Sequence, residues 1–125
     1  MSRINLIRPS ITFEEISLKI EKLIKQGIYS NGENIKKFSA EISKITKAKY
    51  CFPTSSATVA LWTCLKLLDI KKGDEVLVSD FSYPATANVI EDLGAKPIFV
   101  DVCIKCFNMK PVELEKKITP KTKAV

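Results

Sequence analysis

A run of small and hydroxyl-bearing residues, 54–58, is the first part of the chain whose side chains could do chemistry. It follows a short aromatic segment, 49–53, that is predicted to be a strand, and it precedes an apolar segment, 59–70, that is predicted to be a helix. The first turn of a helix offers unpaired backbone N–H groups and a positive dipole end, and small residues let a phosphate approach them. The run therefore suits a phosphate, although Ser55 or Ser56 would serve equally well as an N-cap without any ligand.

A second candidate is the loop 80–84, which follows the next predicted strand and carries two aromatic residues, Phe81 and Tyr83. One of the two rings could stack on a flat heteroaromatic ligand whose phosphate lies at 54–58. Taken alone, a buried aromatic that packs under the following helix is the simpler interpretation. Open α/β sheets bind ligands at the carboxyl ends of their strands, so two such loops in succession favour a binding site.

The chain has four cysteines and no histidine. The absence of histidine excludes a Ser-His-Asp triad, a Cys-His pair and a His-containing zinc site within this sequence. Cys103 and Cys106 form a C-x-x-C motif, but it follows a strand and leads into a loop, whereas a redox motif normally opens a helix. Cys51 is predicted to lie in a strand and Cys64 in a helix, so we expect ordinary thiols and no metal or redox site.

The net charge of +6 raises the question of nucleic-acid binding. Eighteen of the 20 basic residues are lysines and only Arg3 and Arg8 are arginines, whereas guanine readout and phosphate clamping favour arginine. We therefore expect a lysine-rich surface and no nucleic acid as a partner. Because no long apolar stretch and no secretory signal are present, we also expect no membrane association and a cytoplasmic location.

Hydrophobic periodicity predicts how these loops are positioned. Two amphipathic helices, 13–27 and 33–46, come first, and from 49 to 125 short strand and helix signals alternate. This alternation predicts an α/β fold with a parallel-rich sheet and helices on both faces. The last residues, 122–125, read as the beginning of a strand, so we expect the chain to be the N-terminal portion of a larger enzyme.

Three stretches of the sequence, TSSATVAL, KKGDEVLVSDFSYPATANVIEDLGAKPIFVDV and ITPKTKAV, occur in this order. Together with Arg8-Pro9 and IYSNGENIKKF upstream, they closely resemble the sugar aminotransferases of the DegT/DnrJ/StrS family. The resemblance implies an aspartate-aminotransferase-like fold, of which residues 1–125 would be the N-terminal portion of the large domain, with pyridoxal 5'-phosphate (PLP) as cofactor.

The resemblance also implies roles for particular residues. The family's phosphate-binding turn matches Ser56, Ala57 and Thr58, and its ring-stacking aromatic residue matches Tyr83. Its substrate-contacting turn, to which a neighbouring subunit can contribute, matches Tyr29, Ser30, Asn31 and Gly32. None of the 18 lysines matches the family's Schiff-base lysine, so the resemblance implies that this lysine lies beyond residue 125 and that the chain alone has no catalytic residue.

For the complete protein, the resemblance implies a homodimeric enzyme that moves an amino group from an amino acid such as glutamate to a nucleotide-linked keto-sugar. Products of this kind feed the biosynthesis of polysaccharides. A dehydratase of the same family, in which histidine replaces the lysine, is an alternative that this sequence leaves open. A basic, non-enzymatic binding module is an alternative from a different class.

Overall fold

The computed structural model describes residues 10–30 and 32–125, and it divides into two compact units with a boundary between Pro53 and Thr54. The first unit contains two helices, α1 (Phe13–Gln26) and α2 (Glu33–Thr46). The second contains α3 (Ala57–Leu67), β1 (Glu75–Ser79), α4 (Ala85–Asp92), β2 (Lys96–Val100), α5 (Pro111–Lys117) and β3 (Thr122–Ala124). Arg8 and Pro9, which carried part of the resemblance, lie outside the described residues.

Both helices of the first unit begin and end where the sequence predicted, to within one residue. At the start of α1 the Glu15 carboxylate accepts a hydrogen bond from the backbone N–H of Thr12 at 2.8 Å. At its end, Gly27 adopts φ +65°, and its N–H bonds to the carbonyl of Ile24. This left-handed conformation costs glycine little, which explains why the helix ends here. Neither helix contains a fully buried residue.

The predicted strand at 49–53 is wrong. These residues form neither helix nor strand, and the side chains of Tyr50 and Phe52 are 68% and 84% exposed. A strand exists only where another strand accepts and donates its backbone hydrogen bonds, and no segment among residues 10–30 and 32–125 pairs with this one. The alternating aromatic residues of KYCFP indicated a strand, but strand pairing depends on partners that a local pattern does not contain.

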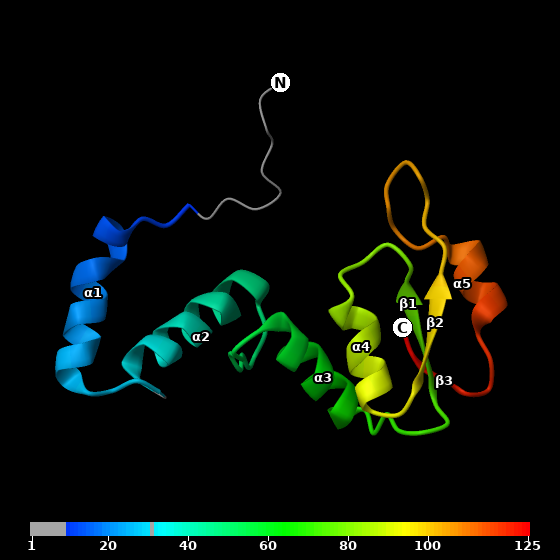
Figure 1. Ribbon diagram of the computed structural model, residues 1–125, viewed down its shortest axis with the longest axis horizontal. Coiled ribbons are helices and arrows are strands. Elements are labelled where there is room, and N and C mark those ends of the chain that lie inside the picture. Colours follow the sequence, from blue (N-terminus) through cyan, green and yellow to red (C-terminus); the bar gives the residue numbers. More distant parts are fainter. Residues whose placement is uncertain (1–9, 31) are drawn as a thin grey trace. The chain divides into compact units, whose positions relative to one another are not determined.

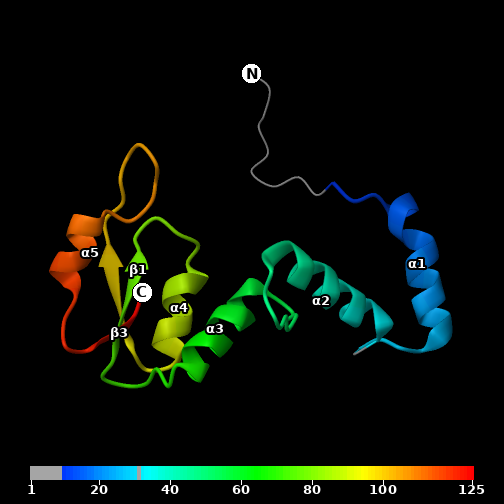
Figure 2. The same ribbon diagram turned by 180° about the vertical axis from the view of Figure 1, so that it is seen from behind.

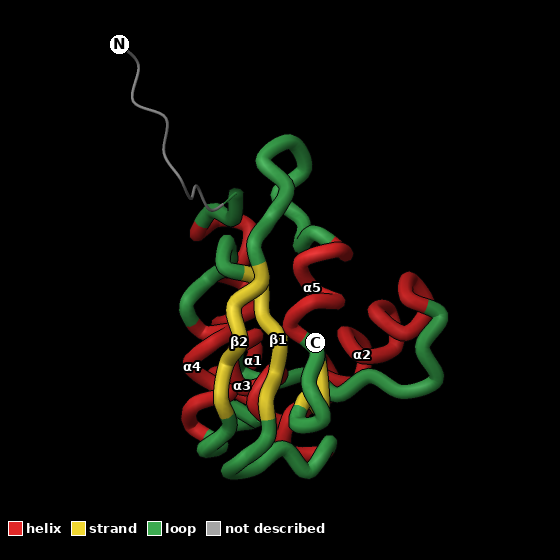
Figure 3. Tube along the Cα trace, turned by 90° about the vertical axis from the view of Figure 1, so that its right-hand side faces the viewer, coloured by secondary structure: helices red, strands yellow, loops and turns green. Residues whose placement is uncertain are grey.

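The second unit is built on a three-stranded parallel sheet in the order β2-β1-β3. The central strand pairs with β2 from Glu75 opposite Lys96 to Ser79 opposite Val100. Figure 1 and Figure 3 show α4 on one side of this sheet and α5 on the other. The predicted parallel sheet with helices on both faces is therefore confirmed.

All the fully buried side chains of the described residues belong to this unit, and they are apolar. Val76 and Val78 of β1 pack with Val89 and Ile90 of α4, while Leu77 is buried at the alternate position of the strand. The complete set is Ile70, Val76, Leu77, Val78, Ala85, Val89, Ile90, Ala95 and Val100. This core supports the carboxyl ends of β1 and β2, from which the loops 80–84 and 101–110 leave.

The helix α3 ends at Leu67, three residues earlier than the sequence predicted. Asp69 takes a left-handed conformation with φ +55°, and the N–H of Ile70 bonds to the carbonyl of Leu65. This turn directs Ile70 into the core, where it is only 2% exposed. Burial of an aliphatic side chain is worth about 1.5–3 kcal/mol, which offsets the cost of ending the helix early.

Candidate functional site

The start of α3 is the part of the second unit that the sequence predicted to hold a phosphate. Ser56 is the N-cap, and its hydroxyl accepts a hydrogen bond from the N–H of Val59 at 3.3 Å. The hydroxyl of Thr54 donates to the carbonyl of Ser56 at 2.8 Å, which steadies the turn. Among the described residues no acceptor bonds to the N–H groups of Ala57 and Thr58, so both donors are open to a ligand.

The capping arrangement has a consequence for the three predicted phosphate ligands. The Ser56 hydroxyl keeps its own proton for a ligand while its lone pair serves the helix, because a hydroxyl group both donates and accepts. Ala57 offers only its backbone N–H, and Thr58 offers both an N–H and a hydroxyl. The N-cap interpretation and the phosphate interpretation are therefore compatible in this turn.

The loop 80–84 presents an aromatic ring rather than burying it. Tyr83 is 78% exposed, and its carbonyl accepts hydrogen bonds from the N–H and the hydroxyl of Thr86 at 3.0 and 2.8 Å. At the other end of the loop, the Ser79 hydroxyl bonds with the backbone of Phe81. Since its backbone is anchored at both ends, the loop holds the Tyr83 ring outward without packing it under α4.

Thr58 and Tyr83 line the same pocket, which has a volume of about 530 Å³. Pro84 and residues of α4 complete the wall: Ala85, Asn88, Val89, Glu91 and Asp92. The two features that the sequence predicted to act together, a helix N-terminus and an exposed ring, thus bound one hollow. Hydrogen-bond donors beside an apolar, aromatic wall suit a flat ring that carries a phosphate, so the residues present fit PLP.

Two further properties of this pocket bear on its chemistry. No lysine is among its lining residues, within the part of the chain that the structure describes. Glu91 and Asp92 give the wall formed by the end of α4 a negative charge, which would repel a phosphate placed beside them. Asn88 was not predicted from the sequence, although its place one helical turn after Pro84 could have indicated it. Its amide adds both a donor and an acceptor to the pocket.

The predicted substrate residues belong to the first unit. Tyr29, Ser30 and Gly32 line a pocket of about 470 Å³ between the end of α1 and the start of α2, whereas Asn31 lies outside the described residues. Lysines from both helices also line this pocket: Lys19, Lys22 and Lys37. Lys19 and Lys22 are three residues apart and so share one face of α1, a signal that the sequence analysis did not use. The charges of the three lysines exceed that of Glu33, the one carboxylate among the described lining residues, and so suit an anionic ligand.

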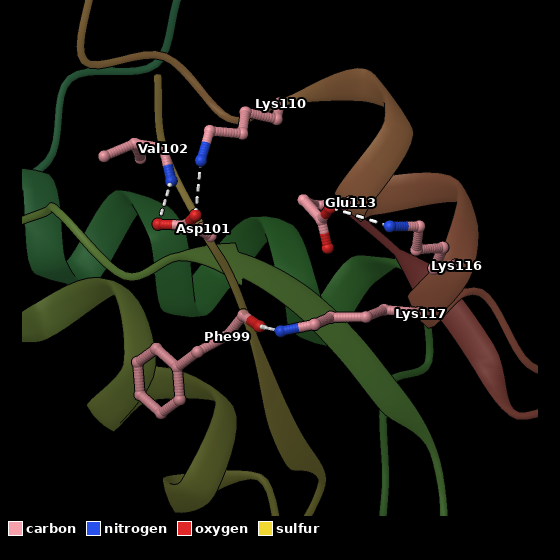
Figure 4. Close-up of polar contacts among 7 residues, drawn as sticks. All are labelled: Phe99, Asp101, Val102, Lys110, Glu113, Lys116 and Lys117. Atoms are coloured by element: carbon pink, nitrogen blue, oxygen red, sulfur yellow. Dashed lines mark hydrogen bonds and ion pairs between the residues drawn. The ribbon is translucent and has the colours of Figure 1, made fainter. Parts of the chain in front are cut away.

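Charged side chains also fasten the loop that leaves β2 (Figure 4). The Lys110 ammonium pairs with the Asp101 carboxylate at 2.5 Å, and the same carboxylate accepts the N–H of Val102 at 2.9 Å. The hydrogen bond from Lys110 lowers the pKa of Asp101 and in turn raises the pKa of Lys110. Beyond this pair, the Lys117 ammonium donates to the carbonyl of Phe99 on β2.

The described residues, 10–30 and 32–125, contain neither a metal cluster nor a membrane-spanning helix. No group of three or more His, Cys, Asp or Glu side chains is arranged to hold a metal ion there. The helices of this part of the chain are also too short or too polar to cross a bilayer. All four cysteines are free thiols.

Several known proteins are similar to this chain in sequence and in structure. GDP-perosamine synthase of Escherichia coli O157:H7 is 38% identical over 125 residues, which are 100% of this chain and 34% of that enzyme. The structure of Spr1654 from Streptococcus pneumoniae, assigned as a sugar aminotransferase and solved in its PLP form, superposes with a TM-score of 0.88 and 32% identity. The superposition covers 97% of this chain and 31% of the Spr1654 chain.

A dehydratase is also among the similar structures. The GDP-4-keto-6-deoxy-D-mannose-3-dehydratase of E. coli, with bound hydrated PLP, has a TM-score of 0.78 and 26% identity over 90% of this chain and 31% of its own. The chain thus spans about a third of the length of the relatives it matches. The family described as DegT/DnrJ/EryC1/StrS aminotransferases matches residues 10–125, and the chain belongs to this family.

Proposed function

We propose that the whole protein is a PLP-dependent aminotransferase that acts on a nucleotide-linked keto-sugar. The amino group would come from an amino acid such as glutamate, which leaves as 2-oxoglutarate, and the sugar carbonyl would become an amine. The observation that carries the proposal is the pocket shared by Thr58 and Tyr83, in a chain that belongs to the sugar aminotransferase family. Family membership also supports an enzyme over the basic binding module.

The residues of the second unit would bind and orient the cofactor. The N–H groups of Ala57 and Thr58, the Thr58 hydroxyl and the Ser56 hydroxyl would hold its phosphate at the positive end of α3. The exposed ring of Tyr83 would stack against its pyridine ring. When bound, PLP supplies the electron sink that lets an amino group leave one carbon and join another.

A lysine from outside the described pocket would have to complete the site. Nucleophilic lysines act in desolvated surroundings that lower their pKa, and no lysine lines the Thr58–Tyr83 pocket. We therefore propose that residues 1–125 provide part of the cofactor-binding site and have no catalytic activity by themselves. Tyr29, Ser30, Asn31 and Gly32 remain the proposed substrate contacts, with Lys19, Lys22 and Lys37 available to the phosphates of a sugar nucleotide.

Two further properties of the whole protein belong to the same proposal. We infer a homodimer, because the chain belongs to a family whose active sites the resemblance places at a dimer interface. We infer a cytoplasmic enzyme, because its four thiols are unpaired, as is usual in a reducing compartment. Size measurement by light scattering tests the first inference, and cell fractionation tests the second.

The decisive experiment follows the transfer of ¹⁵N from glutamate to the sugar nucleotide. The whole protein is purified, its PLP content is measured, and it is incubated with ¹⁵N-glutamate and a panel of nucleotide-linked keto-sugars. Transfer of ¹⁵N to the sugar nucleotide with equal formation of 2-oxoglutarate supports the proposal. A PLP-containing protein that places no ¹⁵N in the sugar nucleotide, but yields a sugar that has lost a hydroxyl group, would instead be the dehydratase, which the similar E. coli structure makes the second candidate.

A further inference from the structure

The hairpin 101–110, which leaves the carboxyl end of β2, holds two cysteines that the proposed function does not use. Cys103 is half-buried and Cys106 is exposed, and both are free thiols. From the sequence, ordinary loop thiols are expected here, because no helix follows the C-x-x-C motif. The structure supplies what a helix would have supplied: a closed turn that fixes the two side chains relative to each other.

Two backbone hydrogen bonds close this turn. The N–H of Phe107 donates to the carbonyl of Cys103 at 2.7 Å, and the N–H of Cys103 donates to the carbonyl of Asn108 at 2.9 Å. The first bond is the i to i+4 bond of one helical turn, in which side chains three residues apart are neighbours with Cβ atoms about 5–6 Å apart. A disulfide needs Cβ atoms about 3.5–4.5 Å apart. A small adjustment of the turn would therefore bring the two sulfur atoms within bonding distance.

Three contacts hold the hairpin in place, so its turn is already ordered before any disulfide forms. Val102 and Met109 form an antiparallel bridge, and the Asp101 carboxylate pairs with Lys110 beside it (Figure 4). The ring of Phe107 lies against Phe81 of the neighbouring loop, with 5.2 Å between ring centroids. Figure 2 shows this hairpin and the loop after β1 at the same end of the sheet. Because the chain is already ordered, closing a bond across it costs little further entropy.

The environment of Cys103 also favours the reactive form of its thiol. The nearby backbone N–H of Lys105, then that of Cys106, then the Cys106 thiol, stabilise the Cys103 thiolate and lower the pKa of Cys103. The Lys110 ammonium adds a weaker attraction for the thiolate. Since the thiolate is the nucleophile in disulfide exchange, Cys103 is the thiol that would attack first, and the exposed Cys106 is placed to resolve the product.

We propose that Cys103 and Cys106 are a redox modification site that forms a reversible disulfide by exchange with low-molecular-weight disulfides. The Cys103 thiolate attacks one sulfur of the small disulfide, forming a mixed disulfide and releasing one small thiolate. Cys106 then loses its proton to water and attacks the Cys103 sulfur, forming the intramolecular bond and releasing the second small thiolate. The two protein sulfurs give up two electrons, and the small disulfide is reduced to two thiols.

The test titrates the whole purified protein, with its cofactor, against glutathione buffers that range from fully reduced to fully oxidised. Free thiols are then blocked with iodoacetamide, and the intact mass and the peptides are measured by mass spectrometry. The proposal expects the loss of two alkylatable thiols in one step, with the cross-link mapped to Cys103 and Cys106. It also expects the Cys106→Ser variant to stop at a glutathione adduct on Cys103.

The double variant Cys51→Ser, Cys64→Ser is the matched control and should titrate like the wild type. Three results would overturn the proposal: both hairpin thiols remain alkylatable in oxidised glutathione, a glutathione adduct persists on wild-type Cys103, or the cross-link maps to another pair. The rate of Cys103 alkylation against pH is a second measurement. Its midpoint should lie below the ordinary value of a cysteine thiol, about 8.5.

Discussion

The loops after β1 and β2 start from adjacent positions, because Ser79 and Val100 are paired in the sheet, yet they are built in opposite ways. Loop 80–84 is short and holds the ring of Tyr83 out to a pocket. Hairpin 101–110 is longer and is closed on itself by backbone bonds and by an ion pair. Parallel strands bring their carboxyl ends together, but the bonds within each loop decide whether the loop borders a pocket or closes on itself.

The largest effect on stability is expected for a buried residue of β1, because the core around this strand supports both loops. Leu77 lies at the centre of β1 and is 2% exposed, so Leu77→Ala should cost about 2–5 kcal/mol of unfolding free energy and loosen both loops together. Thermal and denaturant unfolding of the whole protein measure the loss. Leu18→Ala is the matched control, since Leu18 on α1 is 77% exposed and should change stability by less than about 0.5 kcal/mol. Equal losses in the two variants would show that β1 is not the support.

The next effect separates the loops. Tyr83→Ala should weaken retention of the cofactor because it removes the stacking surface, whereas Tyr83→Phe, which keeps a ring, should bind nearly as the wild type does. Stacking of a planar base on an aromatic side chain is worth about 1–3 kcal/mol, which corresponds to about one to two decades in affinity. Equilibrium dialysis of the whole protein with PLP measures this. If the Tyr83→Ala variant folds and still retains the cofactor fully, Tyr83 does not stack on the cofactor.

A smaller effect concerns the contact that joins the two loops. The rings of Phe81 and Phe107 are tilted by 35° at 5.2 Å, and pairs of this kind are worth about 0.5–1.5 kcal/mol beyond the area they bury. In a double-mutant cycle with Phe81→Leu and Phe107→Leu, the two losses of unfolding free energy should sum to more than the loss in the double variant. Strict additivity would mean that the loops are independent of each other.

The same two loops show what the sequence could predict and what it could not. Loop 80–84 was predicted because it lies between a strand and a helix with local signals: apolar residues of β1 before it, and Pro84 at the start of α4 after it. The helix ends at Gly27 and Gly94 were predictable for the same reason, since both glycines have positive φ. Local chemistry determined these features, and local chemistry can be read from a sequence.

Hairpin 101–110 could not be predicted in the same way, because the bonds that close it link residues far apart in the sequence or of unexpected types. Lys110 reaches back nine residues to Asp101, and Phe107 adopts φ +58°, a conformation that is rare for a bulky residue. The strand predicted at 49–53 failed for a related reason: its pattern was local, but a strand also needs a partner, and no described segment pairs with it. The roles of Ser56, Ala57, Thr58 and Tyr83 stay predictions, although Thr58 and Tyr83 line one pocket.

The smallest effect tests the ion pair at the base of the hairpin. The pKa of Asp101 is lowered in the folded protein, so its contribution to stability is present above its unfolded value, about 3.9, and is lost as pH falls through the folded value. The pKa of Lys110 is raised, so its contribution is present below about 10.4 and is lost as pH rises through the folded value. The pair therefore acts across the neutral range.

Replacing Lys110 by methionine should raise the pKa of Asp101, as measured by NMR titration of its carboxyl group. The pKa of Asp101 should return only partly to its ordinary value, because the N–H of Val102 still donates to the carboxylate and Lys117 still attracts it. Lys105→Met is the matched control, since Lys105 lies in the same hairpin but is not among the groups that lower this pKa. If both variants moved the pKa of Asp101 equally, the cause would be the general positive charge of the hairpin and not the Asp101–Lys110 contact. That charge, and not a specific ion pair, would then distinguish the hairpin from the open loop at 80–84.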